Sequence, residues 1–212
     1  MGQAALKREG RYTWTDYRTW PADEQWELIG GEAFDMSPAP GTRHQTVVTE
    51  LGRQFGNHFQ GKPCKVFVAP TDVKLSEADI VQPDLIVVCD ENRIKPTHIE
   101  GPPTLVIEVL SPSTQAYDRV RKLRLFAASG VQEVWLVTPY PSLVEVLMLD
   151  GASYRIAGGY TRDETPVSVA FPELQIDPTA LFDFPLTPED AIQRVKEDHA
   201  PYGNPAVAAE TN

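Results

Sequence analysis

The chain has 212 residues, of which 42% are hydrophobic and 23% are charged, the balance of a globular protein rather than of a disordered or membrane chain. This length suits one domain with short extensions. No apolar run approaches a membrane span and residues 1–10 contain no apolar signal core, so we expect a cytoplasmic protein. The formal net charge of -11 weighs against extensive contact with nucleic acid, which depends on Lys and Arg neutralising phosphates, although a local basic strip can still follow a backbone.

The first half of the chain predicts a short helix, a hairpin, a long helix and three extended segments. Thr13 is a typical N-cap for the short helix, and the Gly30-Gly31 pair predicts the hairpin turn. Apolar residues at helical spacing predict the long helix from Thr42 to about Gln60, with Thr42 as its cap. Alternating or continuously apolar runs predict strands over 65–75, 80–89 and 104–110.

The second half predicts a helix over 115–129, with Gly130 in the position of a C-cap. Further strands and a last, proline-started helix are predicted at 133–138, 143–149, 154–157 and 187–198. This order of elements predicts an α/β or α+β fold with a mixed central β-sheet flanked by helices.

The expected organisation is a single domain at 13–186, preceded by an extension at 1–12 and followed by a helix and a disordered tail at 187–212. Cys64 and Cys89, the only cysteines, are far apart in the sequence and form no Cys-x-x-Cys pair. Neither a disulfide framework nor a zinc knuckle is therefore predicted, and we interpret both residues as small buried apolar groups.

Two acidic residues, Asp84 and Glu108, interrupt otherwise apolar predicted strands. Because side chains alternate along a strand, each acid shares its face with apolar neighbours, a placement that costs free energy unless a cation compensates. The alternative is that both strands lie at a sheet edge, with each acid in solvent or paired with an arginine. Two such acids on neighbouring strands favour a site for a hard divalent cation held against a phosphate.

Lys122 is the candidate cationic side chain. It lies four residues after Asp118 on the predicted helix, so an exposed salt bridge between the two is the alternative interpretation. The short connection 111–114 from the Glu108 strand instead brings the first turns of this helix close to the carboxylates. Lys122 would there orient a water nucleophile or stabilise charge that develops on phosphorus.

Several motifs follow one another in order between Thr13 and Ile156. Together they resemble the Uma-type restriction endonuclease family, which has been classed as a domain of unknown function. The most specific of these motifs is Glu-Val-Leu-Ser-Pro-Ser-Thr. The motifs are Trp26-Glu27-Leu28-Ile29-x-Gly31-Glu32, Met36-Ser37-Pro38, His44, Gln82-Pro83-Asp84-Leu85, Val106-Ile107-Glu108-Val109-Leu110-Ser111-Pro112-Ser113-Thr114, Asp118-x-x-x-Lys122-Leu123 and Gly130-Val131-x-Glu133-x-Trp135-Leu136-Val137.

The resemblance implies a PD-(D/E)xK restriction-endonuclease-like core in which Asp84 and Glu108 bind a divalent metal. We expect this metal to be Mg2+ or Mn2+, with the backbone carbonyl of Val109 as a further ligand. The general pattern places a lysine two residues after the glutamate, whereas this chain has Leu110 there. As in related families in which that lysine has moved to the adjoining helix, Lys122 would supply the charge.

Three further residues are candidates for the same site. Glu32 matches the position at which many such nucleases add another acid, His44 is either a phosphate contact or a polar packing group, and Asp118 is the partner of Lys122 in the alternative interpretation. We expect Lys122→Ala to abolish cleavage and leave the fold intact, as a surface substitution that shifts stability by about 0.5 kcal/mol or less. Lys122→Arg is not expected to restore cleavage, because a planar guanidinium replaces a compact charge poorly.

The predicted function is hydrolysis of DNA phosphodiester bonds by a metal-dependent endonuclease that acts as a homodimer. The alternative is a catalytically inactive nuclease-fold module that binds DNA or a protein partner. Signatures of NTP, dinucleotide and elbow-serine sites are missing, so no nucleotide cofactor is expected. A glycosidase with two carboxylates remains formally open, although no tract of aromatic residues suggests a sugar platform.

Overall fold

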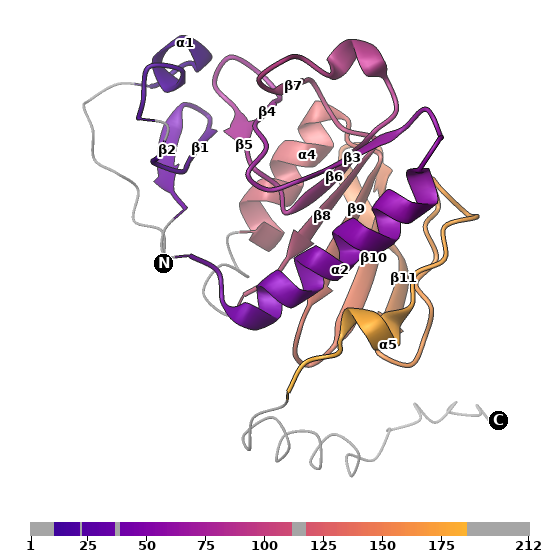
Figure 1. Ribbon diagram of the computed structural model, residues 1–212. Coiled ribbons are helices and arrows are strands. Elements are labelled where there is room, and N and C mark those ends of the chain that lie inside the picture. Colours follow the sequence, from indigo (N-terminus) through magenta and orange to yellow (C-terminus); the bar gives the residue numbers. More distant parts are fainter. Residues whose placement is uncertain (1–10, 22, 37–38, 112–117, 186–212) are drawn as a thin grey trace, which may run out of the picture.

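A computed structural model describes residues 11–21, 23–36, 39–111 and 118–185 of the chain. They form an α+β fold of two mixed sheets and their covering helices (Figure 1), which confirms the predicted class. The elements in order are α1 (Trp14–Tyr17), β1 (Trp26–Ile29), β2 (Glu32–Asp35), α2 (Thr42–Phe59), β3 (Lys65–Val68), β4 (Val73–Lys74), β5 (Ile80–Val81), β6 (Leu85–Val88), η1 (Glu91–Arg93), β7 (Ile99–Glu100), β8 (Leu105–Val109), η2 (Asp118–Lys122), α4 (Leu123–Ser129), β9 (Glu133–Thr138), β10 (Leu143–Asp150), β11 (Ser153–Thr161) and α5 (Pro178–Leu181).

The larger sheet has six strands in the order β11-β10-β9-β8-β6-β3. Only β8 and β9 run parallel among its paired strands, and the α4 helix connects them; the other pairs are antiparallel. Figure 1 shows α2 crossing one side of this sheet with α5 below it, and α4 on the far side. The β8 strand therefore lies in the interior of the sheet, between β6 and β9, which excludes the edge-strand alternative for Glu108.

The smaller sheet has the order β2-β1-β5-β4-β7, and the sequence did not predict it as a separate unit. The predicted strands 65–75 and 80–89 are each divided between the two sheets. A proline lies at each division, Pro70 in the first segment and Pro83 in the second. Because proline has no backbone N–H to donate to a ladder, the chain leaves one sheet there and enters the other.

Two apolar clusters fill the faces of the larger sheet. One joins α2 and α5 to the sheet, with Phe55 and Trp135 fully buried near its centre. The other joins α4 and strands of the smaller sheet to the opposite face, with Phe126 buried among them. Within the described ranges, none of the helices is long and apolar enough to cross a membrane.

The predicted helix over 115–129 differs from the structure in its first described turns. Asp118–Lys122 is π-helical, and the α-helix begins only at Leu123. In this wider turn the apolar Val120 is 49% exposed, whereas the charged Lys122 is 2% exposed. Gly130 ends the helix in the left-handed conformation, as predicted.

Three smaller predictions have different outcomes. The capping role of Thr13 is confirmed, since its hydroxyl accepts a hydrogen bond from the backbone N–H of Asp16. Thr42 is the first residue of α2 rather than its cap, which is Gly41. The predicted helix at 187–198 lies outside the described residues.

The interpretation of Cys64 and Cys89 as separate apolar residues is wrong, because they form a disulfide. They lie one residue beyond the last paired residues of β3 and β6, Lys65 and Val88, and so face each other across the two strands. Distance along the sequence was misleading here, since the 25-residue separation is taken up by an excursion through the smaller sheet.

Candidate active site

The two predicted acids meet where β6 begins and β8 ends. In the antiparallel ladder of these strands, Leu85 pairs with Ile107, and the next position holds Asp84 and Glu108. Asp84 lies just before the first residue of β6 and is therefore outside the paired ladder, whereas Glu108 belongs to β8. Glu108 is 3% exposed and Asp84 is partly exposed, so one carboxylate lies inside the protein and the other at the surface of the same site.

Asp84 is held by a backbone group and by a histidine. Its Oδ2 accepts a hydrogen bond of 2.7 Å from the backbone N–H of Val109, the residue after Glu108. Its Oδ1 lies 3.2 Å from Nε2 of His44, which belongs to the first turn of α2 and has a side chain only 12% exposed. These contacts fix the carboxylate of Asp84 beside the end of β8.

Lys122 lies inside the protein, next to Glu108. Its Nζ is 3.1 Å from Oε1 and 3.3 Å from Oε2 of Glu108, so the helix brings its ammonium to the buried carboxylate as the sequence predicted. The expectation that Lys122→Ala behaves as a surface substitution is wrong, because the lysine is 2% exposed. The π-helical turn that ends at Lys122 accounts for this inward position, and such turns are frequent at functional sites.

Glu27 is a member of this cluster that the sequence did not identify. It lies in β1, is fully buried, and places Oε1 2.9 Å from Nζ of Lys122. The available signal was an acid within the apolar run Trp-Glu-Leu-Ile, the same signal that identified Asp84 and Glu108. This signal is weak for Glu27 because the run is only four residues long and adjoins a hairpin turn.

The other candidates lie differently. The side chain of Glu32 is 69% exposed and lies 3.8 Å from Nη1 of Arg121, so Glu27, not Glu32, is the hairpin acid beside Lys122. The side chain of Asp118 lies outside the described part of the chain. The structure thus brings Asp84, Glu108 and Lys122 together.

A hydrogen-bond network continues from Glu27 towards α1. Oε1 of Glu27 accepts the backbone N–H of Gln82, whose side-chain amide donates to the hydroxyl of Tyr17 and to Asp72. Burial, followed by the charge of Asp72, raises the pKa of Tyr17 well above its usual value. The Tyr17 hydroxyl therefore stays protonated, and it donates a hydrogen bond of 2.7 Å to Oδ1 of Asp72.

The donor set suits a hard cation that keeps much of its hydration. Among the described residues, no group of three or more His, Cys, Asp or Glu side chains is arranged to hold a metal ion. Asp84 and Glu108 supply two carboxylates at the adjoining ends of β6 and β8. Mg2+ is commonly held by one or two carboxylates together with water and substrate phosphate. Among the described side chains, three acids, Glu27, Glu108 and Asp84, lie in a cluster with Lys122, and His44 lies beside Asp84, so a divalent cation would help to balance the cluster.

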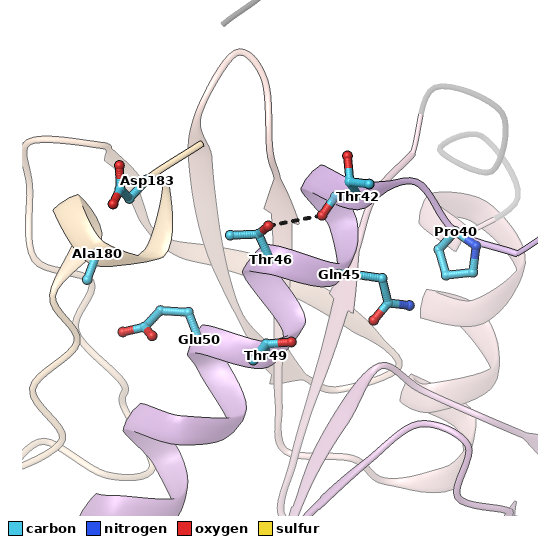
Figure 2. A pocket seen from close by; sticks show the side chains of 8 residues that line it. All are labelled: Pro40, Thr42, Gln45, Thr46, Thr49, Glu50, Ala180 and Asp183. Carbon is cyan, nitrogen blue, oxygen red and sulfur yellow. Dashed lines mark hydrogen bonds between the residues drawn. The ribbon is translucent and has the colours of Figure 1, made fainter. Parts of the chain in front are cut away.

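A separate pocket of about 590 Å³ lies between α2 and α5. Figure 2 shows Thr46, Thr49 and Glu50 of α2 on its wall, with Ala180 and Asp183 opposite. None of its lining residues belongs to the cluster of Asp84, Glu108 and Lys122. The catalytic candidates therefore lie at the ends of β6 and β8, away from this pocket.

Comparisons with known proteins show the family and the fold to which the chain is similar. Residues 14–179 match the model of the Uma2 family, described as "Putative restriction endonuclease". An uncharacterized protein of Synechocystis sp. is 31% identical over 121 residues, which cover 57% of this chain and 63% of the relative. The alignment thus spans less than two thirds of that relative's length.

A solved structure has a similar fold. The crystal structure of "a putative nuclease belonging to DUF820" from Anabaena variabilis superposes with a TM-score of 0.65 at 20% identity. The match covers 80% of this chain and 97% of the other. At this identity the likeness concerns the fold alone.

Proposed function

Since the chain belongs to the Uma2 restriction endonuclease family, we propose that it is a metal-dependent endonuclease that hydrolyses DNA phosphodiester bonds. The observation that carries the proposal is the adjacency of three groups. Asp84 accepts a hydrogen bond from the backbone N–H of Val109, the residue after Glu108, and the ammonium of Lys122 lies 3.1 Å from Glu108. Carboxylates can hold a divalent cation that activates water, and a lysine can stabilise the charge that develops on the phosphate.

Each residue has a separate task in this proposal. Asp84, Glu108 and the backbone carbonyl of Val109 would hold Mg2+ or Mn2+. The cation, when bound, supplies Lewis-acid activation of the phosphodiester and of the attacking water. Lys122 places a fixed positive charge beside the reacting phosphate, where it favours the charge that develops during bond cleavage.

The acidic net charge limits how DNA is bound. A chain with a formal charge of -11 gains little from nonspecific attraction to phosphates, so the divalent cation has to contribute much of the local positive charge. We therefore expect affinity for DNA to depend strongly on the cation.

The decisive experiment combines cleavage with metal binding. Plasmid, single-stranded and structured DNA are incubated with the protein in Mg2+, in Mn2+ and in EDTA, and cleavage is expected only with a cation. Calorimetric titration with Mg2+ should show a site that is lost in Asp84→Ala. If neither cleavage nor binding occurs at millimolar metal, the chain is instead an inactive nuclease-fold module.

A further inference from the structure

Lys122 is shared between two buried carboxylates that come from different sheets. Glu108 belongs to β8 of the larger sheet, and Glu27 belongs to β1 of the smaller one. The Nζ atom lies 2.9 Å from Oε1 of Glu27 and 3.1 Å from Oε1 of Glu108. The lysine is therefore positioned from both sides, and its orientation depends on Glu27 as much as on Glu108.

The same oxygen of Glu27 also fixes the backbone that leads to Asp84. Oε1 accepts the backbone N–H of Gln82 at 2.9 Å, and Gln82 precedes Asp84 by two residues. The carboxylate of Glu27 in the smaller sheet thus holds both the ammonium of Lys122 and the segment that carries Asp84.

Structural stabilisation alone does not account for Glu27. Lys122 already pairs with both oxygens of Glu108, and a second carboxylate adds a desolvation cost to a buried pair. Oε2 of Glu27 is buried and has no hydrogen-bond partner within the described ranges, which adds a further cost of about 1–3 kcal/mol. A role of Glu27 in holding Lys122 in position explains why a carboxylate lies at this buried place in β1.

We propose that Glu27 is a positioning residue that shares the ammonium of Lys122 with Glu108 and fixes its orientation. Glu108 then keeps electron pairs for the divalent cation, and Lys122 keeps its direction towards the reacting phosphate. The inference rests on the nuclease function proposed above. Glu27 is not assigned as a metal ligand, because the described acids form no group of three around one point.

The test is Glu27→Gln, which keeps the size of the side chain and removes its charge. We expect kcat for DNA cleavage to fall about 10–100-fold, the usual loss for a residue that orients a catalytic group, with KM for DNA unchanged. The affinity for Mg2+, measured by calorimetry, should weaken without being lost, since Lys122 then competes fully for Glu108. Glu27→Asp, which keeps the charge but is one methylene shorter, should lie between Glu27→Gln and the wild type.

A second measurement does not depend on cleavage. Lysine acylation followed by mass spectrometry reports how well Lys122 is held, and the residue should be protected in the wild type and react faster in Glu27→Gln. The matched control is Glu133→Gln, which removes an equally buried carboxylate from the larger sheet and should leave both kcat and the acylation of Lys122 unchanged.

The outcomes separate the inference from the function. An unchanged kcat in folded Glu27→Gln, or unchanged acylation of Lys122, would overturn the positioning role. Complete loss of Mg2+ binding, as in Asp84→Ala, would overturn it in favour of direct ligation. If the wild type cleaves no DNA, the proposed function fails, and the acylation of Lys122 still decides whether Glu27 holds the lysine.

Discussion

The larger sheet buries a glutamate on each of its two faces, and the two are satisfied in opposite ways. Glu133 in β9 lies on the α2 side, where Oε1 accepts the indole N–H of Trp135 and Oε2 accepts the backbone N–H of Ala170, both at 2.6 Å. Glu108 in β8 lies on the α4 side, where its described partner is the ammonium of Lys122, which it shares with Glu27.

This difference separates an anchor from a candidate active site. Glu133 has one neutral donor for each oxygen, so it fastens the segment around Ala170 to the sheet and needs no further ligand. Glu108 lies in a cluster with more negative than positive charge, next to a partly exposed second acid, Asp84. Burial of a carboxylate is thus common to both sites, and the charge of its partners distinguishes them.

The strongest test of this contrast is the removal of the positive charge by Lys122→Met. The change leaves Glu27 and Glu108 buried without their shared counter-ion, so we expect a loss of about 3–5 kcal/mol in the free energy of unfolding, together with loss of cleavage. Urea denaturation and the plasmid assay measure the two effects.

Arg121→Met is the matched control: this neighbouring cation is 52% exposed, and its loss should cost about 1 kcal/mol or less. Equal stability of the two variants would show that the site tolerates unpaired carboxylates, and the contrast with Glu133 would then disappear.

A smaller loss is expected on the other face. In Glu133→Gln one carboxylate oxygen becomes an NH2 group, so the side chain can accept only one of the two N–H groups of Trp135 and Ala170. The other N–H loses its partner, and the expected loss in the free energy of unfolding is about 1–3 kcal/mol. Mg2+ binding and cleavage should stay at wild-type values because the side chain lies across the sheet from Asp84 and Glu108. Denaturation, calorimetry and cleavage on one preparation check all three values. Loss of metal binding in this variant would mean that the two faces are coupled.

The sequence predicted Asp84, Glu108 and Lys122 as a group but gave no basis for separating Glu108 from Glu133. Both glutamates lie in apolar strands, and only the fold shows which donors surround each of them. The resemblance to a family supplied that distinction, whereas periodicity alone did not.

Two other features required three-dimensional information. The inward position of Lys122 depends on a π-helical turn, which adds a residue per turn locally and is not visible in a pattern of apolar positions. The disulfide of Cys64 with Cys89 depends on strand register across a long excursion. The hairpin, α2, β8 and β9 followed from local patterns, because each is a continuous segment with its own periodicity and turn residues.

The smallest effect is expected for His44, whose role the sequence left open between a phosphate contact and a packing group. Its Nε2 lies 3.2 Å from Oδ1 of Asp84, and its Nδ1 is buried with no hydrogen-bond partner in the described ranges. This geometry favours a role in orienting Asp84, because Nε2, the ring nitrogen with a partner among the described residues, faces the carboxylate of Asp84.

His44→Ala should therefore weaken Mg2+ affinity about tenfold, equivalent to about 1.4 kcal/mol, with little change in KM for DNA. A phosphate contact would give the reverse: unchanged Mg2+ affinity, a higher KM and a weaker dependence of DNA binding on salt. His58→Ala, in the last turn of the same helix, is the control that should change neither quantity, so calorimetry on the two variants decides between the two roles.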